Sequence, residues 1–135
     1  MTTAGARVAV INSSDDTVEM LRIQLESAGM VTVGGHVPDI KRGKVDFLEF
    51  VRVHRPEVAV WDIGPPYEEN WAFFNLIRTT DAGRSIRFVV TTTNRDRLLK
   101  VCHDCDPIEI VGKPYDLEQV TAAVKAALSQ RPGDG

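Results

Sequence analysis

The sequence has only two cysteines and no long apolar run. Cys102 and Cys105 stand close together, and residues 1–7 lack the apolar core of a secretory signal, so we expect reduced thiols rather than a disulfide framework. No stretch approaches the ~20 apolar residues that cross a bilayer. These absences predict a cytoplasmic protein with no membrane segment.

Basic residues are not in excess either, and the formal net charge is -3. A chain without a positive field is a poor binder of polyanions, so we expect no nucleic-acid binding by this domain. The short basic cluster Lys41, Arg42 and Lys44 is interpreted as a solvated loop. No glycine-rich phosphate loop, no nucleophile paired with a base and no metal-ligand cluster stands out, so the sequence does not predict an enzyme.

The length and the hydrophobic content of the chain fit one compact domain. The chain has 135 residues, of which 43% are hydrophobic, and single domains commonly have about 100 to 150 residues. We expect an N-terminal tail over residues 1–6, one domain over 7–128, and a tail or the start of a linker over 129–135.

Five short apolar runs predict strands, and segments with helical spacing follow each of them. The predicted strands are Val8–Ile11, Val31–Gly34, Glu57–Trp61, Ile86–Val90 and Ile108–Val111. The predicted helices are Val18–Ala28, Val45–His54, Trp71–Arg78, Arg95–Cys105 and Leu117–Leu128. Strands that alternate with helices indicate a parallel sheet with helices on both faces, a three-layer α/β/α architecture.

In such sheets the functional residues lie just after the strands, at their carboxyl ends. The residues at these positions are Asn12, Ser13 and Ser14, then Asp62, then Thr91, Thr92 and Thr93, and finally Lys113 with Pro114. Asp15 and Asp16 follow one turn later and are interpreted as helix N-terminal acids, which the helix dipole favours.

At these positions the chain resembles the receiver domains of bacterial response regulators, over nearly its whole length. The loop from Asp62 to Pro66 is similar to the family's phosphoacceptor loop, Thr91 matches its switch hydroxyl, and Lys113-Pro114 matches its Lys-Pro step, whose peptide bond is usually cis. The resemblance implies a (βα)5 flavodoxin-like fold with strand order 2-1-3-4-5.

The sequence departs from this family pattern at several positions. Asn12 and Ser13 replace two adjacent acids, and Ile110 replaces an aromatic switch residue. Asn70 replaces a glycine and could still tolerate a positive φ. The segment between Val33 and Val45 is several residues longer than is common in the family.

The missing acids change the expected charge balance. In the family, three carboxylates and a carbonyl, here matching Gly64, surround Mg²⁺, which offsets the excess negative charge during phosphoryl transfer. Here Asp62 and Lys113 alone sum to zero. We therefore expect no bound cofactor, weak or absent Mg²⁺ binding, and slow or absent phosphorylation.

Three roles of Asp62 remain open at this stage: a turn cap or ion-pair partner of Lys113, a sensing role without phosphate, and a phosphoacceptor. The leading hypothesis is an atypical receiver domain in two-component signalling that binds a protein partner: a histidine kinase, an effector domain, a downstream regulator or a second copy through its fourth and fifth helices. The alternatives are a working phospho-receiver and a small-molecule sensor.

Two further motifs favour structural roles. Cys102 and Cys105 share a predicted helix face with Leu98 and are interpreted as small core residues rather than a redox or zinc site. Of Trp71, Phe73 and Phe74, at least one is expected to lie outside the core.

Overall fold

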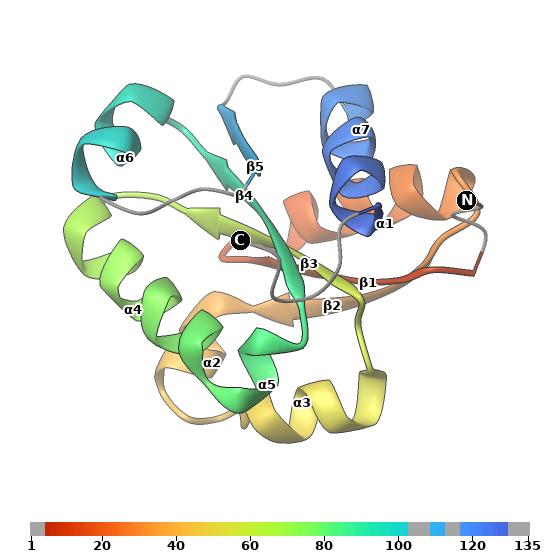
Figure 1. Cartoon of the computed structure of the whole chain (residues 1–135), viewed down its shortest axis with the longest axis horizontal. Coiled ribbons are helices and arrows are strands. Elements are labelled where there is room, and N and C mark those ends of the chain that lie inside the picture. Colours follow the sequence, from red (N-terminus) through yellow and green to blue (C-terminus); the bar gives the residue numbers. More distant parts are fainter. Residues whose placement is uncertain (1–4, 103–108, 113–116, 130–135) are drawn as a thin grey trace.

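A computed structural model describes residues 5–102, 109–112 and 117–129, and shows one sheet of five parallel strands in the order β2-β1-β3-β4-β5 (Figure 1). The predicted fold class and strand order are therefore confirmed. The strands are β1 (Arg7–Asn12), β2 (Val31–His36), β3 (Val58–Ile63), β4 (Arg87–Thr92) and β5 (Glu109–Gly112).

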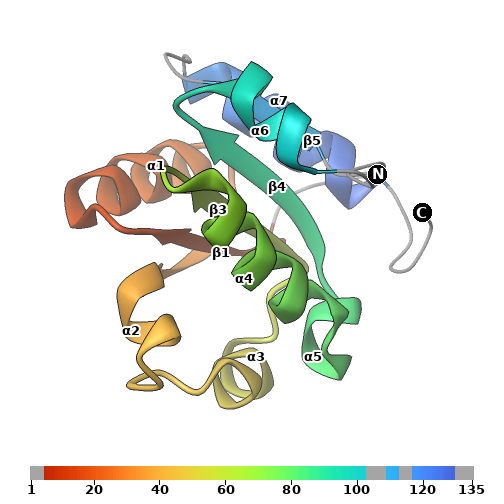
Figure 2. The same cartoon turned by 90° about the vertical axis from the view of Figure 1, so that its left-hand side faces the viewer.

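Helices connect the strands and cover the sheet on both faces (Figures 1 and 2). They are α1 (Asp15–Ser27), α2 (Val37–Lys41), α3 (Phe47–His54), α4 (Tyr67–Thr79), α5 (Asp81–Arg84), α6 (Arg95–Val101) and α7 (Leu117–Leu128). Within the described residues, no helix is long and apolar enough to cross a membrane.

Because successive side chains of each strand point to opposite faces of the sheet, the core is divided into two layers, one on each face. In β3, Val58 and Val60 pack with the buried residues of α1 and α7, whereas Ala59, Trp61 and Ile63 pack with those of α2 to α6. Successive side chains of a strand point to opposite faces, so a central strand that is covered on both sides must be apolar throughout. The continuously apolar runs in the sequence follow from this burial.

Two short helices, α2 and α5, were not predicted. The sequence suggested only an unusually long connection between Val33 and Val45, and α2 lies within it. Pro38 in its first turn fits a helix start, and Ile40 buries one position of the helix in the core. Helix α5 is a single turn that is capped by the Thr80 side chain, which accepts the Gly83 N–H at 3.0 Å. Such short helices carry too little periodicity to be read from sequence.

The ends of the longer helices agree with their capping residues. Ser14 accepts the N–H of Thr17 and begins α1, and Asp46 accepts the N–H of Glu49 and begins α3. Gly29, with φ at +92°, follows the end of α1. Helix α4 begins at Tyr67, one turn before the predicted start, which places Asn70 inside the helix.

The aromatic side chains of α4 separate into core and boundary positions. Phe74 is fully buried and packs against the rings of Trp61 and Phe88, with centroids 5.7 and 5.2 Å apart. Trp71 is also buried, whereas Phe73 is half-buried. Of the three, Phe73 therefore lies at the boundary of the core, where it still packs against it.

The neighbouring residues Phe74 and Phe73 provide a test of this assignment. Phe74→Ala should lower the free energy of unfolding by about 3 to 5 kcal/mol, because it leaves a cavity between the sheet and α4. Phe73→Ala should cost clearly less. Urea unfolding followed by circular dichroism measures both, and equal losses would contradict the packing described here.

Candidate functional site

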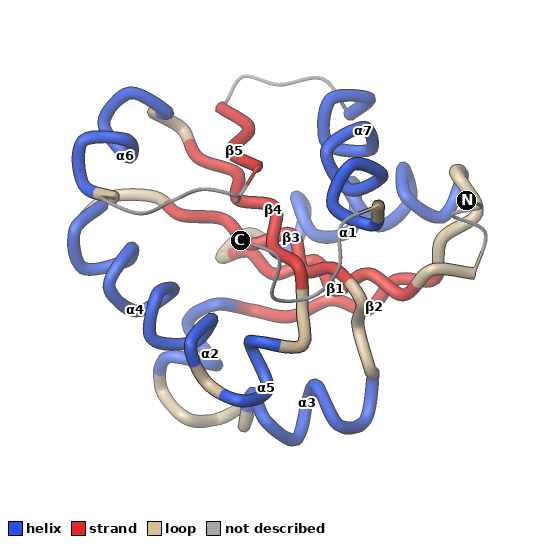
Figure 3. Tube along the Cα trace, viewed as in Figure 1, coloured by secondary structure: helices blue, strands red, loops and turns tan. Residues whose placement is uncertain are grey.

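The loops that follow β1, β3 and β4 lie at one end of the sheet, next to the starts of α1, α4 and α6 (Figure 3). Asn12, Asp62 and Thr91 stand at the ends of these three strands. Alternation places all three side chains on the α1 and α7 face, because each follows Val10, Val60 or Val89 by two positions. Sheet topology thus brings three residues together from distant parts of the sequence.

Asp62 is held by the neighbouring strand. The two residues are paired in the register of β3 and β4, and the Thr91 hydroxyl donates a hydrogen bond of 2.6 Å to the Asp62 Oδ1. Thr91 is completely buried, while Asp62 is partly exposed. A short bond to an ionised acceptor is among the stronger hydrogen bonds in proteins. One carboxylate oxygen therefore already has a fixed protein donor.

The loop after β1 directs Asn12 toward its own backbone. The Asn12 Oδ1 accepts the Ser14 N–H at 3.0 Å, a local turn that an asparagine or aspartate side chain commonly forms. Asn12 is 2% exposed, whereas Ser13 is exposed. Asp15 and Asp16 are exposed in the first turn of α1, as interpreted from the sequence.

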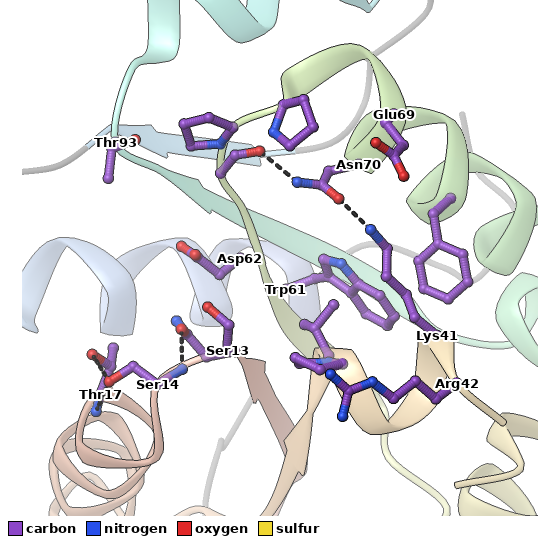
Figure 4. A pocket seen from close by; sticks show the side chains of 17 residues that line it. Ser13, Ser14, Thr17, Lys41, Arg42, Trp61, Asp62, Glu69, Asn70 and Thr93 are labelled. Atoms are coloured by element: carbon purple, nitrogen blue, oxygen red, sulfur yellow. Dashed lines mark hydrogen bonds between the residues drawn. The ribbon is translucent and has the colours of Figure 1, made fainter. Parts of the chain in front are cut away.

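A chain of hydrogen bonds closes the opposite side of the site. The Asn70 Nδ2 donates to the Gly64 carbonyl oxygen at 2.7 Å, and the Lys41 ammonium donates to the Asn70 Oδ1 (Figure 4). Lys41 also lies over the ring of Phe73, 5.6 Å from its centroid. These contacts, here called the Lys41–Asn70–Gly64 chain, join the end of α2 to α4 and to the loop after β3.

A cavity of about 680 Å³ lies at this end of the sheet (Figure 4). It extends from the end of β1, past Asp62, to α2. The lining residues are Asn12, Ser13, Ser14, Thr17, Val37, Pro38, Lys41, Arg42, Trp61, Asp62, Gly64, Pro65, Pro66, Glu69, Asn70, Phe73 and Thr93.

The structure resembles solved receiver domains. The receiver domain of a histidine kinase from Syntrophus aciditrophicus superposes with a TM-score of 0.72 at 19% identity, covering 93% of this chain and 91% of that one. The chemotaxis response regulator CheY4 of Vibrio cholerae superposes with a TM-score of 0.71 at 17% identity, covering 93% and 100%. The chain has the fold of response-regulator receiver domains. The resemblance predicted from the sequence is confirmed at this level.

The sequence comparisons agree with the receiver fold. The virulence transcriptional regulatory protein PhoP of Salmonella typhimurium is 24% identical over 130 residues, which are 94% of this chain and 54% of PhoP. The chain thus spans about half the length of the curated relative it matches. No family model matches the sequence.

Within the receiver fold, the structure corrects several details of the sequence interpretation. Asn70, which the sequence indicated could tolerate a positive φ, instead lies in the first turn of α4 and uses its side chain for hydrogen bonds. The basic cluster is not simply a solvated loop, because Lys41 ends α2 and lines the cavity together with Arg42.

Thr92 differs from its neighbours. It is fully buried, and alternation turns it to the face of Phe88 and Val90, away from Asp62. Thr93 lines the cavity instead, and its hydroxyl contacts that of Tyr67 at 2.8 Å. Lys41 and Arg42 were missed as site residues because their positions depend on α2. Thr93 was already among the residues expected after the fourth strand.

Other sequence predictions fall partly outside the described residues. Lys113, Pro114 and Cys105 lie there, so the expected partner of Asp62, the Lys-Pro step and half of the cysteine pair are not described. Cys102 is buried at the end of α6. Ile110, at the aromatic switch position, is half-buried against the α4 and α6 side of the core.

The residues at the strand ends suit Mg²⁺ poorly. This hard ion prefers several carboxylate oxygens in near-octahedral geometry. Here Asn12 offers a neutral oxygen that already accepts Ser14, Ser13 offers a neutral hydroxyl, and the Gly64 carbonyl already accepts Asn70. In the described part of the chain, no group of three or more acidic, histidine or cysteine side chains could hold a metal.

The bond between Thr91 and Asp62 can be tested by a double-mutant cycle. Thr91→Val keeps the volume but removes the donor, so it should lower the free energy of unfolding by about 1 to 3 kcal/mol. Thr91→Ser keeps the hydroxyl and should cost less. In an Asp62→Ala background the effect of Thr91→Val should shrink; if urea unfolding gave strictly additive losses, the two side chains would not be coupled.

Proposed function

We propose that this chain is a receiver module of two-component signalling that works by protein–protein contact and without Mg²⁺-dependent phosphorylation. The receiver fold and the similarity to PhoP support the signalling context. One observation carries the second part: the oxygens of Asn12 and Gly64, which occupy the positions of family metal ligands, are already engaged by protein N–H groups.

The charges at the strand ends support the same proposal. A phosphoryl donor brings negative oxygens toward a carboxylate, and catalysis requires positive charge placed there in advance. With Asn12 and Ser13 neutral, the site lacks the acids that would attract a divalent cation. Asp62 instead fits a structural and conformational role, since the Thr91 hydroxyl fixes one of its oxygens.

A signal then has to reach the module through binding. The partner classes that fit a receiver fold are a histidine kinase, an effector domain, a downstream regulator and a second copy of the chain. We propose no catalytic reaction for the chain. In this view Asp62 and Thr91 maintain one conformation of the strand ends, and partner contact replaces phosphorylation as the input.

The direct test uses Trp61, which precedes Asp62. A Trp71→Phe background leaves Trp61 as the remaining tryptophan, because the sequence contains two. Millimolar Mg²⁺ should leave the Trp61 fluorescence unchanged, and beryllofluoride or acetyl phosphate should give no adduct by mass spectrometry. A stable adduct on Asp62 would refute the proposal in favour of a working phospho-receiver.

The complementary experiment restores the two acids that Asn12 and Ser13 replace, and it should produce Mg²⁺ binding. Asn12→Asp keeps an oxygen that can accept the Ser14 N–H, and Ser13→Asp changes an exposed position, so the double variant should fold. It should acquire a Mg²⁺-dependent change in Trp61 fluorescence, because three carboxylates then converge. Adding Asp62→Asn to the double variant should abolish that change. If the double variant remained insensitive to Mg²⁺, the missing acids would not explain the behaviour of the wild type.

A further inference from the structure

The cavity has dimensions typical of small-molecule sites. Its volume of about 680 Å³ lies within the range of roughly 300 to 1,000 Å³ found for such pockets. The part that faces α2 is formed by the long connection after β2, where α2 brings Val37, Pro38, Lys41 and Arg42 to the strand ends. The charges and apolar surface of these lining residues determine which class of ligand would bind.

The α2 side of the cavity is cationic. Arg42 is exposed, and its guanidinium forms no hydrogen bond or ion pair with any described residue. Lys41 uses one of its three N–H groups on Asn70, which leaves two for a ligand. A guanidinium offers a planar fork of donors that matches a carboxylate or a phosphate group. This side of the cavity therefore selects an anionic group.

The other polar residues limit the ligand's total charge. Asp62 and Glu69 line the same cavity, so the four charged lining residues among those described sum to zero. A polyanion such as a nucleoside triphosphate would face these carboxylates. A single acidic group near Arg42 avoids them.

The remaining surface favours an apolar body. Val37, Pro38, Pro65, Pro66 and Phe73 contribute carbon-rich surface between the charged groups. Pockets of this kind derive affinity from apolar contact and orientation from a few polar groups.

We propose that this cavity binds a small organic acid with an apolar body, its acidic group held by Arg42 and Lys41. The inference rests on the proposed function, because a site that held Mg²⁺ and a phosphoryl group at Asp62 would not leave this space to another ligand. Ligand binding here would act on α2 and α4 together, since Lys41 and Asn70 connect the two helices.

The test is an NMR titration of the nitrogen-15-labelled full chain with three related probes. Para-hydroxyphenylacetate carries a carboxylate, phenyl phosphate carries a phosphate, and para-hydroxyphenylacetamide is the neutral isostere of the first. An acid should shift the backbone amides of Ser13, Arg42 and Thr93 and the indole N–H of Trp61, whereas the amide probe should not. The acid that binds with the higher affinity identifies the acidic group that the site prefers.

Variants connect the binding to the residues. Arg42→Gln changes an exposed side chain whose guanidinium forms no hydrogen bond or ion pair with a described residue, so it should leave folding intact. It should weaken acid binding about tenfold through loss of a charge-assisted contact. Lys44→Gln removes the same charge from the same basic cluster but does not line the cavity, and it should bind as the wild type does.

Several results would overturn the inference: no binding of either acid, equal binding of the neutral amide, shifts located outside the cavity, or full affinity in Arg42→Gln. The same sample treated with Mg²⁺ and acetyl phosphate separates this inference from the proposed function. Formation of an acyl phosphate on Asp62 would refute the proposed function. If Asp62 stayed unphosphorylated and neither acid probe bound, only the ligand site would be refuted.

Discussion

Burial of a parallel sheet on both faces is the constraint from which the rest of the structure follows. Parallel neighbours need long crossovers, and those crossovers become the helices that cover the sheet. Because all strands run the same way, their carboxyl ends share one edge. Asn12, Asp62 and Thr91 meet there although they are far apart in sequence, and any chemistry of the molecule has to use what this edge provides.

The same constraint explains how much of the fold could be predicted. Central strands such as β3 need apolar side chains on both faces, so their sequence is distinctive, and the order of strands and helices follows from their alternation. Helix α2 could not be predicted from the sequence, because its five residues contain one buried side chain, Ile40, and so give no periodic pattern. The additional length between Val33 and Val45 was visible in the sequence, but its conformation was not.

Position along a strand could be read from the sequence, whereas the direction of a side chain near the strand end could not. Asn12 and Asp62 stand at strand ends and Gly64 follows one, and all three line the cavity. Of the three threonines expected after the fourth strand, Thr92 points away from the cavity and Thr93 lines it, since a shift of one residue turns a side chain to the other face. The hydrogen bond from Asn70 to Gly64 could not be read from sequence, because it depends on where α4 begins.

The Lys41–Asn70–Gly64 chain has a consequence for how this protein can vary in evolution. A lysine at the end of α2 is linked to the loop after β3 only if the first turn of α4 presents an amide oxygen to it. That amide is oriented only while its nitrogen donates to the Gly64 carbonyl. We therefore expect the residues at positions 41 and 70 to be coupled. Among relatives that carry the longer connection after β2, they should change together, and shortening that connection should release position 70 to vary.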